Sequence, residues 1–70
     1  MLGRCRIKEL LDRRNLSQVE LAEITGLSVK YINDKANDRG PRGMELANAK
    51  LVALALDCSI EDLYEWIVIP

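Results

Sequence analysis

Apolar side chains in the first part of the chain recur at spacings of three and four residues. Ile7, Leu10 and Leu11 form one such stripe within the otherwise charged segment 4–14. This spacing is typical of a helix that buries one face. Asn15 follows the stripe and can end the helix in a left-handed conformation. The pattern therefore predicts a first helix over residues 4–14.

A second helix is predicted from the residues at its start and at its end. Ser17 and Glu20 have the spacing of a capping box, in which each side chain accepts a backbone N–H at the start of a helix. Leu16 can pack just before the cap as a hydrophobic staple. Gly26 can end the helix with positive φ at no steric cost. We therefore expect this helix to begin near Gln18.

The next helix follows after a turn of only three residues, 25–27. Ser28 can cap it, and Ile32 would face back toward the small side chain of Ala22. A small residue at that point allows two helices to cross closely. Residues 18–36 are therefore predicted to form a helix-turn-helix.

The second half of the chain has a loop and two further apolar stripes. Residues 37–43 have turn formers and charges but no apolar side chain, which indicates an exposed loop. Residues 44–56 predict a helix, followed by Asp57 in a left-handed conformation. Its buried face would consist of Leu46, Ala49, Val52, Ala53 and Leu56. A capping box over residues 59–62 would start a fifth helix, with the stripe Ile60, Leu63, Tyr64 and Ile67.

Three spacings in the helix-turn-helix resemble a known family. Ala22 is followed by Gly26 after four residues and by Ile32 six residues later, and residues 16–18 and 20–22 also match the family's opening. The pattern is similar to the Cro/C1-type (XRE-like) family of phage repressors and bacterial transcriptional regulators, from about residue 7 to residue 66. The resemblance implies an all-α, five-helix, lambda-repressor-like DNA-binding domain, and we expect a single domain over residues 1–70.

The resemblance also implies base-reading residues. In this family the second helix of the motif enters the major groove of double-stranded DNA. Lys30 can donate to guanine, Asn33 can bind adenine, and Val29 can contact a thymine methyl group. Tyr31 can contact DNA or can be a packing residue, and both interpretations stay open. The predicted base-reading set is Val29, Lys30, Tyr31, Asn33 and Asp34.

A second set of residues is placed to contact phosphates. Gln18 matches the family's phosphate-contacting glutamine, although an ordinary solvated side chain is the alternative. Glycines beside the loop arginines would allow close approach to the DNA backbone. The predicted phosphate set is Ser17, Gln18, Ser28, Asn37, Arg39 and Arg42. Long-range attraction or simple solvation are both open for Arg4, Arg6, Arg13 and Arg14.

Four positions depart from the family pattern. Many members pair an arginine in the first helix with a glutamate at the end of the recognition helix, where this chain has Leu11 and Ala36. Replacing both charges by apolar groups need not destabilise a fold, although one phosphate contact is lost. Lys35 stands where an apolar residue is expected, and Asp34 adds a negative charge to a face that would meet phosphates.

Charge is divided unequally along the chain. Residues 1–42 contain nine Lys/Arg and six Asp/Glu, a net of +3, whereas residues 43–70 contain one and five, a net of −4. The basic part carries the helix-turn-helix, which favours nucleic-acid binding there. Such an asymmetry also arises by chance in a small domain. The overall charge of −1 argues against indiscriminate binding to nucleic acid.

Composition excludes several classes of protein. The chain has no histidine and only two isolated cysteines, so a metal site, a disulfide framework and an enzyme active site are not expected, nor is a cofactor or a small-molecule substrate. Cys58 is expected to be the more buried of the two. No apolar run has the roughly 20 residues that span a bilayer, and the start lacks the apolar stretch of a signal peptide. These features predict a cytoplasmic protein without membrane contact.

The end of the chain carries more apolar surface than one helix can bury. We expect it to form a homodimer or partner interface, because a small domain rarely exposes such a cluster. The alternative is that this tail completes the monomer core. The predicted interface set is Tyr64, Trp66, Ile67, Val68 and Ile69.

Two functions are consistent with these patterns. The first is a sequence-specific DNA-binding transcriptional regulator of repressor type, acting as a homodimer. The second is a protein-interaction module on the same scaffold, which modulates another regulator and has weak or no DNA binding. The acidic Asp34, the acidic second half and the missing phosphate contact favour the second function.

Overall fold

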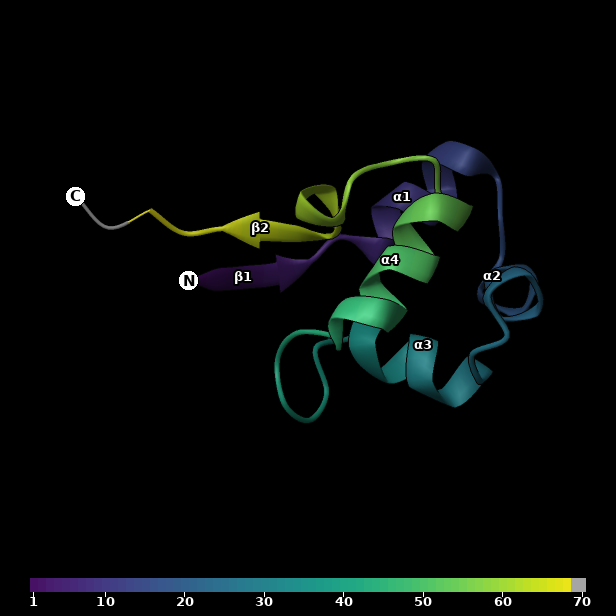
Figure 1. Cartoon of the computed structure of the whole chain (residues 1–70), viewed down its shortest axis with the longest axis horizontal. Coiled ribbons are helices and arrows are strands. Elements are labelled where there is room, and N and C mark those ends of the chain that lie inside the picture. The colour runs from purple at the N-terminus through teal and green to yellow at the C-terminus, as the bar shows by residue number, and fades with distance from the viewer. Residues whose placement is uncertain (69–70) are drawn as a thin grey trace.

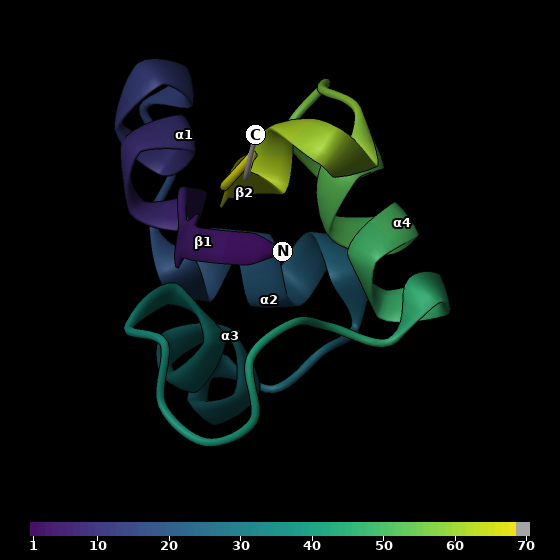
Figure 2. The same ribbon diagram turned by 90° about the vertical axis from the view of Figure 1, so that its left-hand side faces the viewer.

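Four helices and a two-stranded sheet make up the computed structural model, which describes residues 1–68 (Figure 1). In chain order the elements are β1 (Leu2–Cys5), α1 (Ile7–Arg14), α2 (Gln18–Thr25), α3 (Val29–Ala36), α4 (Leu46–Ala55), a 3₁₀ turn (Ile60–Leu63) and β2 (Tyr64–Trp66). Seen from the side of the strands, α1, α3 and α4 are arranged around the sheet (Figure 2).

The predicted helix ends are confirmed at most positions. Asn15 has φ of 54° and ends α1, and Gly26 has φ of 77° and ends α2. The Ser17 hydroxyl accepts the N–H of Glu20, and the Glu20 carboxylate accepts the N–H of Ser17, both at 3.0 Å. Asp57 also has the expected left-handed conformation. These local signals set the boundaries of the helix-turn-helix.

One hydrophobic core joins the helices. Ile32 of α3 and Ala22 of α2 are both buried in it, as the helix-turn-helix pattern predicted. Burial of such a set supplies the main stabilising free energy of a small domain. The largest fully buried side chains are Ile7, Leu21, Ile32, Leu56, Leu63 and Val52.

The prediction of a fifth helix was wrong. Its capping box exists, but it starts only the 3₁₀ turn, and the chain then continues as β2. This strand pairs antiparallel with β1, with Leu2 opposite Trp66 and Cys5 opposite Tyr64 around an irregularity. Gly3 permits the pairing, because a Cβ there would lie 3.0 Å from the Glu65 carbonyl oxygen. Pairing with a distant segment therefore overrides the helical spacing of the apolar residues.

Strand formation also changes which tail residues are buried. Tyr64 was predicted to lie in an interface, but its side chain points into the core and is 6% exposed. Ile67 was predicted in both the buried stripe and the interface set, and it is 49% exposed just after the end of β2, so it is not part of the buried stripe. Trp66 and Val68 are exposed, and Ile69 lies outside the described residues.

The first helix, the fourth helix and the cysteines need smaller corrections. Residues 2–5 form β1, so α1 begins at Ile7 rather than near residue 4. Leu46 begins α4 but is 76% exposed, so it is not part of the buried face. Cys5 is the buried cysteine because β1 directs its side chain inward, whereas Cys58 is half-buried. No helix in residues 1–68 is long and apolar enough to cross a membrane.

Candidate nucleic-acid interface

Helix α3 has one face in the core and one face in solvent. Ile32 and Ala36 are buried, whereas Val29 and Lys30 on the first turn are exposed. The Ser28 hydroxyl accepts the N–H of Tyr31 at 3.0 Å and so fixes the start of the helix. This arrangement leaves the first turn of α3 free to enter a groove of DNA.

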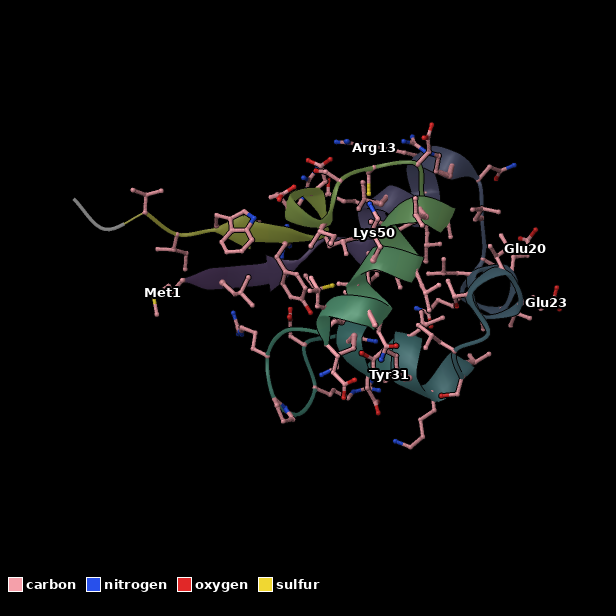
Figure 3. The ribbon with its side chains drawn as sticks, in the orientation of Figure 1. Met1, Arg13, Glu20, Glu23, Tyr31 and Lys50 are labelled. Carbon is pink, nitrogen blue, oxygen red and sulfur yellow. The ribbon has the colours of Figure 1, made fainter. Side chains whose placement is uncertain are left out.

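Tyr31 does not share this outward direction. Its hydroxyl accepts a hydrogen bond from Asn48 at 3.2 Å, and its ring packs against the core between α3 and the first turn of α4 (Figure 3). Lys35 lies 5.7 Å from the ring centroid and donates to the carbonyl oxygen of Pro41 at 3.0 Å. The packing interpretation of Tyr31 is therefore favoured, and Lys35 is engaged by its own loop.

Three predicted DNA-contacting residues are joined by hydrogen bonds. The Asn33 amide nitrogen donates to Gln18 Oε1 at 3.0 Å, across the turn between the two helices of the motif. The Asn33 amide oxygen accepts from Arg39 at 2.8 Å. Gln18 and Arg39 are thus held on either side of one half-buried asparagine.

Asp34 is neutralised within the same surface. Lys30 donates to one carboxylate oxygen at 2.9 Å, and Arg39 lies 3.4 Å from the other. The hydrogen bond from Lys30 holds the pKa of the Asp34 carboxyl below its usual range, and Arg39 adds to the effect. The acid that departs from the family pattern therefore carries its own counter-charges.

The loop after α3 is tied to β1 and α1. Asp38 is in a left-handed conformation and its carboxylate accepts the N–H of Cys5. Asn37 accepts a hydrogen bond from Lys8 of α1 and donates to the carbonyl oxygen of Asn33. These contacts fix the segment that presents Arg39.

Some contacts of this surface were missed by sequence reasoning. Lys8 was not among the predicted residues, although its place outside the apolar stripe of α1 indicated an exposed cation. The link between Asp38 and Cys5 had no sequence signal, since β1 itself was not predicted. Arg42, a predicted phosphate contact, is exposed in the loop but is not brought to Gln18 or Arg39 by any hydrogen bond among the described residues.

Two serines of the predicted phosphate set act as helix caps. Ser17 and Ser28 accept backbone N–H groups at the starts of α2 and α3. A hydroxyl that accepts a hydrogen bond keeps its own hydrogen as a donor. Capping is therefore compatible with a hydrogen bond from either serine to a phosphate oxygen.

The two apolar departures from the family pattern lie in the core. Leu11 of α1 is 4% exposed and Ala36 at the end of α3 is 5% exposed. The positions of the missing ion pair are thus filled by packed apolar groups, which avoids the desolvation cost of burying charges.

The chain has the features of a helix-turn-helix domain of the DNA-binding type. These are the short turn at Gly26, the exposed first turn of α3 and the fixed loop after α3. A family model for the Cro/C1-type HTH DNA-binding domain matches residues 6–68. The chain belongs to this family.

Known proteins are similar to the chain over most of its length. The SPbeta prophage-derived uncharacterized HTH-type transcriptional regulator YopS of Bacillus subtilis (strain 168) is 40% identical over 65 residues, which cover 93% of this chain and 86% of YopS. The restriction-modification controller protein C.AhdI from Aeromonas hydrophila is 36% identical, with a TM-score of 0.71 over 83% of this chain and 85% of C.AhdI.

The regulator of biofilm formation SinR is also similar. Its structure in complex with DNA is 26% identical, with a TM-score of 0.73 over 83% of this chain and 90% of that one. A structure of the SinR/SinI protein complex has a TM-score of 0.76 at 26% identity, over 83% of this chain and 55% of the matched chain. The fold therefore occurs in a structure of SinR with DNA and in a structure of the SinR/SinI protein complex.

Proposed function

We propose that this chain is a sequence-specific DNA-binding transcriptional regulator of repressor type, found in a phage or prophage and acting in the cytoplasm. The observation that carries the proposal is the hydrogen-bonded cluster of Gln18, Asn33 and Arg39, in which Asn33 follows the exposed first turn of α3. Membership of the Cro/C1-type family supports it.

Each part of the candidate interface has a distinct role in the proposal. The start of α2 has free backbone N–H groups beside Gln18, and these suit a phosphate oxygen. Val29 and Lys30 lie over base edges, where Val29 can contact a thymine methyl group and Lys30 can donate to guanine. Arg39 and Arg42 of the loop contact phosphates of the DNA backbone.

The proposed active form is a homodimer. In two antiparallel strands, some opposite residues exchange no backbone hydrogen bonds with each other. The N–H and C=O groups of these residues point away from the partner strand. Leu2 and Trp66 form such a pair, because the flanking Ile67 N–H donates to the Met1 carbonyl oxygen at 2.9 Å. The outer edge of β2 therefore offers backbone groups beside the exposed Trp66, Ile67 and Val68. Two copies can pair these edges about a two-fold axis.

Selection of DNA fragments from random pools tests the proposal. We expect enrichment of a two-fold symmetric sequence with half-sites about one helical turn apart, roughly 34 Å. Affinity should fall steeply with salt, and Arg39→Ala should reduce the salt slope by about one unit. Enrichment of no sequence at low salt would contradict the proposal.

A protein-interaction module is the second candidate. The exposed apolar side chains of Trp66, Ile67 and Val68 favour it, because such clusters often mark protein interfaces. A partner regulatory protein would then cover the outer edge of β2. Binding of this chain to a regulatory protein that persists at high salt and requires Trp66 would support this candidate, provided that the chain retains no duplex DNA.

A further inference from the structure

The orientation of the Gln18 side chain is decided by its neighbour. An amide group has one acceptor oxygen and one donor nitrogen. Asn33 donates to Gln18 Oε1 at 3.0 Å, so the oxygen of Gln18 faces the protein. The NH₂ group of Gln18 is consequently left to face outward. A phosphate only accepts hydrogen bonds, so this is the orientation that a phosphate contact requires.

Arg39 is oriented by the opposite end of the same amide. One terminal nitrogen of Arg39 donates to Asn33 Oδ1 at 2.8 Å and lies 3.4 Å from Asp34. The side chain is nevertheless 62% exposed. A guanidinium carries five N–H donors, so several remain for an anion. Asn33 thus holds the guanidinium of Arg39 at its amide oxygen and the amide of Gln18 at its amide nitrogen.

Asn33 has no free pair of groups for a base. Recognition of adenine by asparagine uses the amide donor and the amide acceptor together. In this chain both ends of the amide already have partners, Gln18 and Arg39. The Asn33 backbone oxygen also accepts from Asn37 at 2.8 Å, which fixes the end of α3. Bidentate reading of a base would require both side-chain hydrogen bonds to break.

We propose that Asn33 is a positioning residue for phosphate binding and not a base-reading residue. It directs the NH₂ group of Gln18 outward and holds the guanidinium of Arg39 beside α3, so that the two donors are arranged before DNA arrives. Such preorganisation lowers the conformational cost of binding. The inference rests on the proposed DNA-binding function and replaces the base-reading role predicted from sequence.

Affinity measurements on a panel of duplexes separate positioning from base reading. The panel contains the selected site and every single base-pair substitution in it. Asn33→Ala should weaken binding to all members by a similar factor, about fivefold to tenfold, because it loosens charge-assisted contacts. The order of affinities across the panel should be the same for this variant as for the wild type. A loss confined to one base pair would overturn the inference.

A double-mutant cycle tests whether Asn33 acts through Gln18. The effect of Asn33→Ala should shrink in a Gln18→Ala background, since one of the two positioned groups is then absent. Additive effects of the two substitutions would contradict the proposal. Asn48→Ala is the matched control, because it removes another half-buried amide whose hydrogen bond goes to Tyr31 instead. This control should bind like the wild type.

NMR of the DNA-free protein tests the hydrogen bonds independently of DNA. One amide proton of Asn33 should exchange with water more slowly than its geminal partner, and Gln18→Ala should abolish the difference. Equal exchange in the wild type would overturn the inference even if the protein binds DNA. If the wild type binds no duplex, the proposed function and the positioning role both fall, and slow exchange would then show only an internal contact.

Discussion

The carboxylate of Asp38 accepts the backbone N–H of Cys5 with both oxygens, each at 3.2 Å. This contact joins the loop after the recognition helix to the first strand of the sheet. Asp38 has φ of 55°, a conformation that aspartate adopts more readily than most residues. The arrangement of the loop that carries Arg39 therefore depends on a strand 33 residues earlier in the chain.

Substitution of Asp38 should destabilise the fold by an amount that depends on the replacement. Asp38→Ala loses the acceptor and places alanine in a left-handed conformation, so the free energy of unfolding should fall by about 1–3 kcal/mol. Asp38→Asn keeps one acceptor oxygen and tolerates the conformation, so its loss should be smaller. Urea denaturation measures both, and equal stability of Asp38→Ala and the wild type would contradict the role of this contact.

Removal of the negative charge at Asp34 should strengthen non-specific DNA binding. Asp34→Asn releases Lys30 and Arg39 from their ion pairs, so two cations become available to phosphates. Affinity for random duplex should rise at low salt, and the gain should vanish at high salt. Titrations of labelled DNA at several salt concentrations measure this.

Glu23→Gln is the matched control for that experiment. It changes the net charge equally, but Glu23 points outward from α2 at the end of the molecule away from the strands (Figure 3). Its effect on affinity should be clearly smaller than that of Asp34→Asn. Equal gains from the two variants would mean that only net charge matters.

Stability should fall in acid partly through Asp62. The N–H of Ser59 donates to this carboxylate at 3.1 Å and holds its pKa below the ordinary value of 3.8, with a second hydrogen bond from the Ser59 hydroxyl. The Asp62 carboxyl binds a proton less readily in the folded state than in the unfolded state. Its contribution to the free energy of unfolding is therefore complete above the ordinary pKa and is lost as the pH falls through the lowered value. Asp62→Asn should make acid unfolding, followed by circular dichroism, less steep. An unchanged pH dependence would exclude this contribution.

A charge on the outer edge of β2 should prevent self-association. Val68 is 85% exposed, so Val68→Lys should leave the monomer folded and place a cation where two copies would meet. Light scattering should then give the monomer mass, against a dimer mass for the wild type. Leu46→Lys, which alters an exposed leucine at the start of α4 instead of the end of β2, should stay dimeric. A wild type that is monomeric at high concentration and on DNA would refute the homodimer.

The parts of the fold that were predicted correctly depend on local chemistry. The capping box of Ser17 and Glu20 and the left-handed Gly26 are set by residues within one helical turn, so the sequence alone specifies them. The sheet depends on pairing between residues 2–5 and 64–66, which are too short and too distant to leave a local pattern. The apolar residues around the second segment matched a helical period by coincidence, and pairing with the first segment decided the outcome.

The same division applies to the candidate site. The exposed first turn of α3 was implied by the family resemblance, together with the inward position predicted for Ile32. The hydrogen bond between Gln18 and Asn33 spans 15 residues and depends on how α2 crosses α3. Residue types suggested that both amides would contact DNA, but only the geometry shows that one of them holds the other.

The pairing of the two ends of the described chain has a consequence for the order of folding. Met1 and Ile67 hydrogen-bond across a separation of 66 residues, whereas the helices form from neighbouring residues. Contacts of such long range form late and local opening begins where contacts are few, so amide hydrogen exchange at Ile67 should need less free energy than exchange at the buried Val52. Because Asp38 accepts the N–H of Cys5 in the same sheet, an opening of the strands that reaches Cys5 removes one contact of the loop that carries Arg39. Among the described residues, the loop then keeps only its hydrogen bonds to α1 and α3, so opening of the sheet should loosen it.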